Sequence, residues 1–196
     1  MLKYLKLILL ILILVLNIIL SIKSEAENIS QVHPNLNFAC QYFKILYNYD
    51  LSAAKFVNES EKINSQKQLI QLFKSQLDFV TSTSDNLLAI KPTLSFNSSF
   101  NETLNGLKIQ REYLINIISE LNKGSSFDKA FLMYNWQFIN AKKHIQQGIQ
   151  EFGNILNTFS NDEQLKIFTA AGLTEEKFYN DFIECQYAAK VQENLN

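Results

Sequence analysis

Two cysteines are the residues of this chain whose chemistry the sequence specifies best. Cys40 and Cys185 are its only two thiols, and each falls on an apolar stripe of helical spacing. In an oxidising compartment an even number of cysteines favours a disulfide, whereas two buried free thiols are the alternative. We predict a Cys40–Cys185 disulfide, which closes a loop of about 145 residues and makes the first and last helices neighbours.

The N-terminal segment is the reason to expect an oxidising compartment. Two lysines precede an apolar run over residues 7–22, and small residues follow in the spacing that a signal peptidase reads. This order predicts a signal peptide over residues 1–26, cleaved between Ala26 and Glu27, and therefore a protein exported to the periplasm or the extracellular space. The alternative is an uncleaved N-terminal membrane anchor, because the run is only slightly shorter than the ~20 residues that span a bilayer.

The remaining chemistry-bearing residues do not form a recognisable catalytic or metal-binding set. His33 and His144 are the only histidines, and neither belongs to an HExxH or ExxH pair. The chain has no CxxC pair, no GxSxG turn and no glycine-rich phosphate loop. We therefore expect no catalytic residue, no bound metal and no cofactor, so the chain is not predicted to be an enzyme.

The net charge of the chain argues against a nucleic-acid partner. Residues 1–26 carry three lysines and one glutamate, so their removal changes the net charge from −1 to about −3. Nucleic-acid-binding domains carry a basic footprint, which this chain lacks. We expect no nucleic-acid partner, and contact with a membrane only through the N-terminal segment before cleavage.

The elements that position these residues are predicted to be helices throughout. Glycine and proline are rare, and no alternating strand pattern occurs. Apolar residues recur at helical spacing in stripes that predict helices over about 36–57, 61–90, 99–124, 127–159, 161–172 and from 174 onward.

Capping signals predict where these helices begin and end. Ser99 and Glu102 have the spacing of a capping box, and Gly124 has the place of a C-terminal glycine. Ser125 or Ser126 is the expected N-cap of the longest helix, and Asn161 that of the next. The sequence thus predicts an all-α fold: a bundle of about four main helices followed by a short C-terminal helical hairpin. Residues 27–35 are predicted to be a polar leader, and residues 36–196 a single helical domain.

The longest stripe contains the residues most relevant to an apolar ligand. Phe131, Phe138 and Ile145 lie on consecutive core steps, where they either fill the interior or line an apolar cavity. We favour core filling. Gly148 occupies a core step of the same stripe, which indicates close packing of another backbone.

Four Asn-x-Ser/Thr triplets are acceptors for glycans if the source is eukaryotic. They begin at Asn28, Asn58, Asn97 and Asn101. Loop and cap polarity explains the triplets equally well, and we prefer that interpretation.

These observations predict an exported helical protein that acts by binding another protein, as an inhibitor, an immunity-type protein or an effector does. One alternative is a carrier that encloses a lipid or other apolar ligand between aromatic stripes. The other is a membrane-anchored structural component of the cell envelope.

Overall fold

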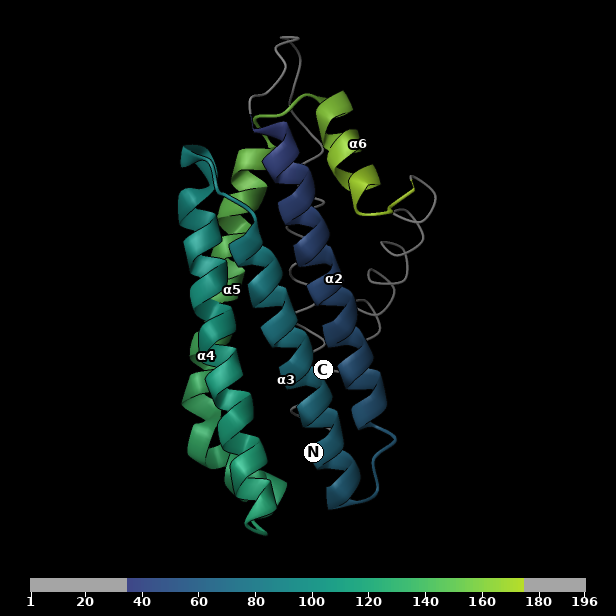
Figure 1. The fold of residues 1–196 in the computed structure, drawn as a ribbon, viewed down its shortest axis with the longest axis vertical. Helices are drawn as coiled ribbons and strands as arrows, with labels where there is room; N and C mark the ends of the chain where they lie inside the picture. The colour runs from purple at the N-terminus through teal and green to yellow at the C-terminus, as the bar shows by residue number, and fades with distance from the viewer. Residues whose placement is uncertain (1–34, 175–196) are drawn as a thin grey trace, which may run out of the picture.

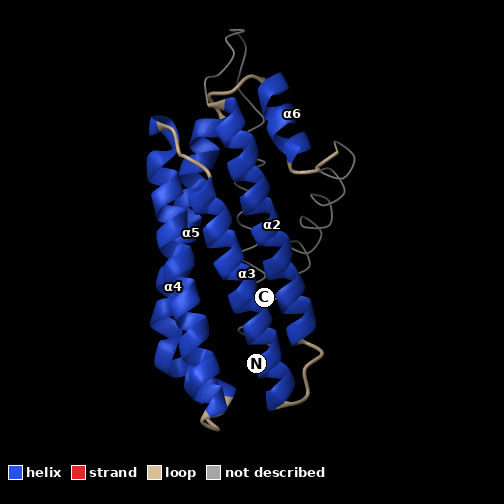
Figure 2. Ribbon diagram, viewed as in Figure 1, coloured by secondary structure: helices blue, strands red, loops and turns tan. Residues whose placement is uncertain are grey.

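The computed structural model describes residues 35–174, and within this range every regular element is a helix (Figures 1 and 2). The prediction of an all-α fold is therefore confirmed for this part of the chain. The elements in chain order are α2 (Leu36–Ser60), α3 (Gln66–Ala89), the short 3₁₀ helix η1 (Leu94–Phe96), α4 (Asn97–Asn122), α5 (Phe127–Leu156) and α6 (Asn161–Ala170).

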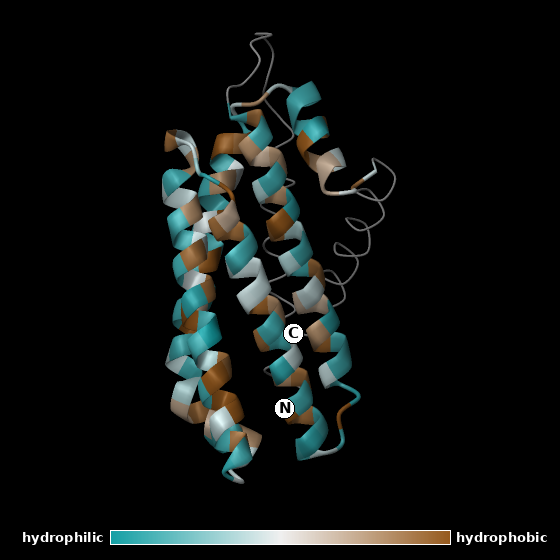
Figure 3. Ribbon diagram, in the orientation of Figure 1, coloured by the Kyte–Doolittle hydropathy of each residue, from teal (hydrophilic) through white to brown (hydrophobic). Residues whose placement is uncertain are grey.

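Four long helices run side by side, and α6 lies against one end of α2 (Figure 1). The most extensive contact joins α4 and α5, while α3 packs on α4, and α2 packs on both α3 and α6. Each helix carries both hydrophobic and hydrophilic residues along its length, coloured brown and teal in Figure 3. Each helix can therefore direct one apolar stripe toward its neighbours. The second helix of the predicted hairpin, the predicted signal peptide and the Ala26–Glu27 bond lie outside the described residues.

Several predicted helix ends are confirmed within a few residues. The Ser126 side chain accepts a hydrogen bond from the Lys129 backbone, so Ser126 is the N-cap of α5. Gly124 ends α4 with φ of 89°, a left-handed conformation that glycine adopts without strain. The predicted helix over 61–90 begins later, at Gln66, because Ser65 caps it through the Gln68 backbone. The predicted helix over 127–159 ends earlier, at Leu156, where the chain turns.

The capping box predicted at Ser99 is wrong. The 3₁₀ turn η1 leads directly into α4, which begins two residues before Ser99. Ser99 is fully buried, and its hydroxyl donates to the Gly148 carbonyl on α5 at 2.7 Å. The helix has thus already begun where the motif occurs. The serine side chain forms a hydrogen bond to another helix instead of capping its own.

The predicted N-cap of α6 is also wrong by one residue. The Ser160 hydroxyl accepts from the Glu163 backbone, and the Glu163 carboxylate accepts in return from the Ser160 backbone. This reciprocal pair is a capping box, which satisfies two amides that the helix leaves free. Asn161 has Gln164 at the same spacing, but the Gln164 side chain donates to the Leu156 and Phe159 carbonyls instead.

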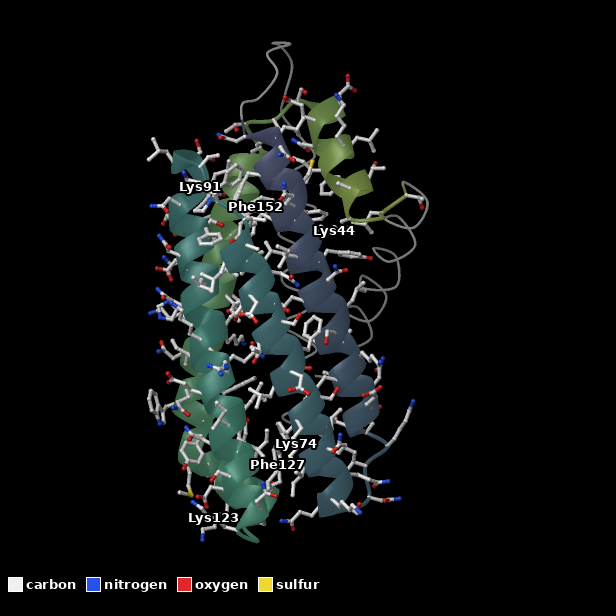
Figure 4. All side chains as sticks on the ribbon, viewed as in Figure 1. Lys44, Lys74, Lys91, Lys123, Phe127 and Phe152 are labelled. Atoms are coloured by element: carbon white, nitrogen blue, oxygen red, sulfur yellow. The ribbon has the colours of Figure 1, made fainter. Side chains whose placement is uncertain are left out.

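Aromatic rings fill much of the interior between α2 and the α4–α5 pair. Phe152 is 1% exposed, and its ring centroid lies 5.0 Å from Tyr42 and 5.6 Å from Phe96. At the other end Phe127 stacks on Phe73, with centroids 5.8 Å apart. Figure 4 shows Phe152 toward one end of the helices and Phe127 toward the other, so the core extends along them.

Candidate functional site

The outward surface of α5 exposes large apolar side chains. Leu132 is 72% exposed, Trp136 64% and Ile139 56%. Their spacing of i, i+4 and i+7 places them on one face of the helix. The buried residues of α5, among them Ala141 and Ile145, follow a stripe on the opposite face. Packing in the core therefore does not explain why Leu132, Trp136 and Ile139 are apolar.

Met133, which is 47% exposed, lies beside this stripe. We call Leu132, Met133, Trp136 and Ile139 the α5 outer face. Trp136 is the only tryptophan of the chain. Isolated apolar residues are normal on a protein surface, but a contiguous group that includes tryptophan is typical of an interaction site.

Charge is distributed unevenly along this helix. Asp128 and Lys129 precede the α5 outer face, and Lys142 and Lys143 follow it. No carboxylate occurs on α5 between Lys129 and Gln150. Lys143 is exposed, while Lys142 is half-buried, and this burial lowers the pKa of its amine. Among the residues of α5 itself, the C-terminal end of the face is therefore basic, and the Glu102 carboxylate of α4 that lies nearby is paired with His144.

The three candidate lining residues lie among other side chains of the interior. Phe131 and Ile145 are buried and Phe138 is half-buried. The Phe138 ring lies 6.3 Å from that of Phe131 and 5.5 Å from that of Tyr113 on α4, measured between centroids. These contacts agree with the core-filling interpretation of the stripe.

A buried polar cluster joins α2, α4 and α5. The Tyr42 hydroxyl lies 2.7 Å from the Thr103 hydroxyl and donates to the Ser99 carbonyl at 3.0 Å. Burial raises the pKa of Tyr42 to about 12, so the phenol stays protonated. Gly148 completes the cluster: a Cβ there would lie 2.7 Å from the Ser99 oxygen and 2.8 Å from the Thr103 nitrogen. The predicted close approach at Gly148 is confirmed, and it is a packing feature.

Of the two histidines, His144 lies within the described residues. His144 Nδ1 lies 2.6 Å from the Glu102 carboxylate, and both side chains remain partly exposed. Within residues 35–174 no group of three His, Cys, Asp or Glu side chains is arranged to hold a metal ion. Glu102, predicted to reach back in a capping box, instead joins α4 to α5. His33 lies outside the described residues.

The predicted disulfide and glycan acceptors are only partly within the described range. Cys40 lies half-buried on α2, where burial raises the pKa of its thiol, whereas Cys185 lies beyond residue 174. Of the sequons, Asn58, Asn97 and Asn101 are exposed on helices, so the loop position expected for Asn97 and Asn101 is wrong, because α4 already begins at Asn97; Asn28 is not described.

One carboxyl group on α2 has a strongly shifted acidity. Asp50 is half-buried, and desolvation raises its pKa from 3.8 to about 7. Its neighbour Tyr49 donates to the Gln110 side chain at 2.7 Å, and burial raises the pKa of this phenol as well. No second carboxyl group is among the causes of the Asp50 shift, so burial alone accounts for it.

Replacing Asp50 with asparagine is expected to stabilise the protein by about 1–3 kcal/mol at pH 8 and to have little effect at pH 4. Because the folded pKa exceeds the unfolded value of 3.8, the folded protein holds more protons between these two pKa values. The free energy of unfolding of the wild type therefore falls as pH rises through this window, up to about pH 7. Asparagine cannot ionise and removes the decline.

Urea denaturation of both proteins from pH 4 to pH 8 measures this difference. Asp78→Asn, at an exposed position of α3, is the matched control and is expected to keep the wild-type pH profile. Parallel pH profiles for wild type and Asp50→Asn would contradict the raised pKa.

No helix within residues 35–174 combines the length and the apolar character needed to cross a membrane. No family model, no curated protein and no solved structure matches the chain. The geometry of the described residues, and above all the α5 outer face, is thus the basis for a functional proposal.

Proposed function

We propose that this chain is an exported helical protein that acts by binding another protein, without a catalytic step of its own. The observation that carries the proposal is the α5 outer face, where Leu132, Trp136 and Ile139 are exposed together. Tryptophan and methionine are enriched in protein interfaces, and tryptophan is among the commonest hot-spot residues.

The packing of α5 supports the same function. Its opposite face is fixed against α4 through the most extensive helix contact of the fold. The exposed side chains therefore stand on a helix that is already ordered before any partner arrives. Binding to such a face costs little backbone entropy, because no segment has to fold on contact.

Export is the second part of the proposal and is supported by the signal-peptide pattern of residues 1–26. Intact-mass analysis of the protein from its own host tests it, since the mature chain should begin at Glu27. A full-length chain retained in the cytosol would contradict export.

We expect a disulfide between Cys40 and Cys185 in the exported protein. Cys40 is half-buried on α2, which packs on α6, and Cys185 follows α6 in the chain. The last described helix before Cys185 therefore lies against the helix that carries Cys40. Peptide mapping without reduction should show the cross-linked pair, and Cys40→Ser should release one alkylatable thiol. Two free thiols in the wild type would contradict the prediction.

Native mass spectrometry of the protein purified from its host tests the binding function. The expected result is a complex whose mass exceeds that of the single chain by that of a second protein. A bare monomer in the exported fraction, under gentle conditions and at several concentrations, would contradict it.

A further inference from the structure

We infer that the α5 outer face docks into an apolar groove of the partner protein, and that this groove carries carboxylates where Lys142 and Lys143 would lie. The inference rests on the proposed function and names the chemistry of the partner. Its first support is the spacing of the exposed residues. Leu132, Trp136 and Ile139 span about 10 Å along the helix axis at the standard rise. Helices that bind in grooves use anchors at i, i+4 and i+7.

The second support is the charge at the two ends of the α5 outer face. At its C-terminal end the α5 outer face is followed by Lys142 and Lys143, and no carboxylate on α5 offsets them before Glu151. At the N-terminal end Asp128 lies next to Lys129, so that end is close to neutral. A groove with acidic groups at one end only would complement this difference in charge. It would therefore determine in which direction α5 lies in the groove.

The shape of the face favours a concave partner over a second copy of this chain. Two convex helix surfaces touch along a line, and an exposed apolar patch of this kind covers only a few hundred Å². Stable interfaces bury about 1,200–2,000 Å² in total. A groove encloses the flanks of α5 as well, so it buries more of this helix than a second α5 does.

The same charge pattern favours a protein over a lipid surface. Asp128, which is exposed four residues before Leu132, would approach anionic headgroups together with the lysines. A groove can place its own polar groups to suit each end, whereas a bilayer presents the same charge to both.

Site-specific cross-linking in the host tests where the partner binds. A photoreactive phenylalanine analogue replaces Trp136 in the full chain, and the control replaces Leu94, which is 97% exposed in η1. We expect one protein, identified by mass spectrometry, to cross-link from position 136 and not from position 94. Cross-links from position 136 to a second copy of the chain or to lipid, equal cross-links from both positions, or none from position 136 would overturn the inference.

Affinity measurements with the identified partner test the chemistry. Trp136→Ala is expected to weaken binding about 30-fold or more, as for a hot-spot residue. Lys143→Glu is expected to weaken it about tenfold and to reduce its salt dependence. Lys108→Glu, at an exposed position of α4, is the matched charge control and should leave binding unchanged. Equal affinities for Lys143→Glu and the wild type would overturn the acidic groove.

These outcomes separate the inference from the proposed function. A native complex that does not cross-link through position 136 contradicts the inference and leaves the binding function in place. A bare monomer in the host contradicts the binding function itself.

Discussion

Replacing Gly148 with alanine is expected to destabilise the protein by about 3 kcal/mol. The added Cβ would lie 2.7 Å from the Ser99 carbonyl oxygen and 2.8 Å from the Thr103 nitrogen. Both atoms belong to the backbone of α4, so relief requires the two helices to move apart. In an ordinary helix interior the same change stabilises by about 0.5–1 kcal/mol, because alanine has the better helix propensity. Gly148→Ala is thus expected to destabilise the protein, whereas helix propensity alone predicts that it stabilises it.

Equilibrium denaturation with urea measures this cost. Gln150→Ala, two residues away at an exposed position of α5, is the matched control and should stay within about 0.5 kcal/mol of the wild type. A Gly148→Ala protein as stable as the wild type would mean that α4 and α5 are less closely packed than the structure shows.

The fold class was predictable because apolar residues recur at helical spacing over long segments. The stripe from Phe127 onward and the stop at Gly124 are local signals, and the structure agrees with both. The all-α prediction depends on local signals of this kind, together with the rarity of glycine and proline. The packing of the helices against one another was harder to predict from the sequence. Side chains such as those of Tyr42 and Ser99 are far apart in the sequence and come into contact only in the folded chain.

The wrong capping-box prediction shows that a local sequence motif does not determine which partners its side chains find in the fold. Ser99 and Glu102 have the correct types and spacing, but η1 starts the helical backbone before them. Each side chain then finds a partner on α5, namely the Gly148 carbonyl and His144. No pattern within the segment itself indicates these partners, which lie more than 40 residues away in sequence.

The α5 outer face was missed although the sequence carries a signal for it. The longest stripe of the chain predicts the core side of this helix, and no role was predicted for its other face. Leu132, Trp136 and Ile139 form a second apolar stripe on that face. Two apolar stripes on one helix predict two contacts, and residues 35–174 supply the one on the core side.

Replacing Phe152 with alanine is expected to cost about 3–5 kcal/mol of folding free energy, the range for truncation of a buried phenylalanine. Phe152 is 1% exposed and contacts three rings from other parts of the chain. Its centroid lies 5.0 Å from Tyr42 and 6.2 Å from Phe43 on α2, and 5.6 Å from Phe96 in η1. The truncated side chain would leave a cavity where α2 meets α5.

Two further variants show whether this cost arises from packing. Phe152→Leu keeps most of the apolar volume, so thermal and urea denaturation should give a loss well below that of the alanine variant. Leu132→Ala removes a side chain of similar character from the α5 outer face and should change stability by less than about 0.5 kcal/mol. Equal losses for Phe152→Ala and Leu132→Ala would contradict the aromatic cluster as the contact that joins α2 to α5. The expected contrast reflects the two faces of α5 within the described residues: one packs in the core, and the other is exposed.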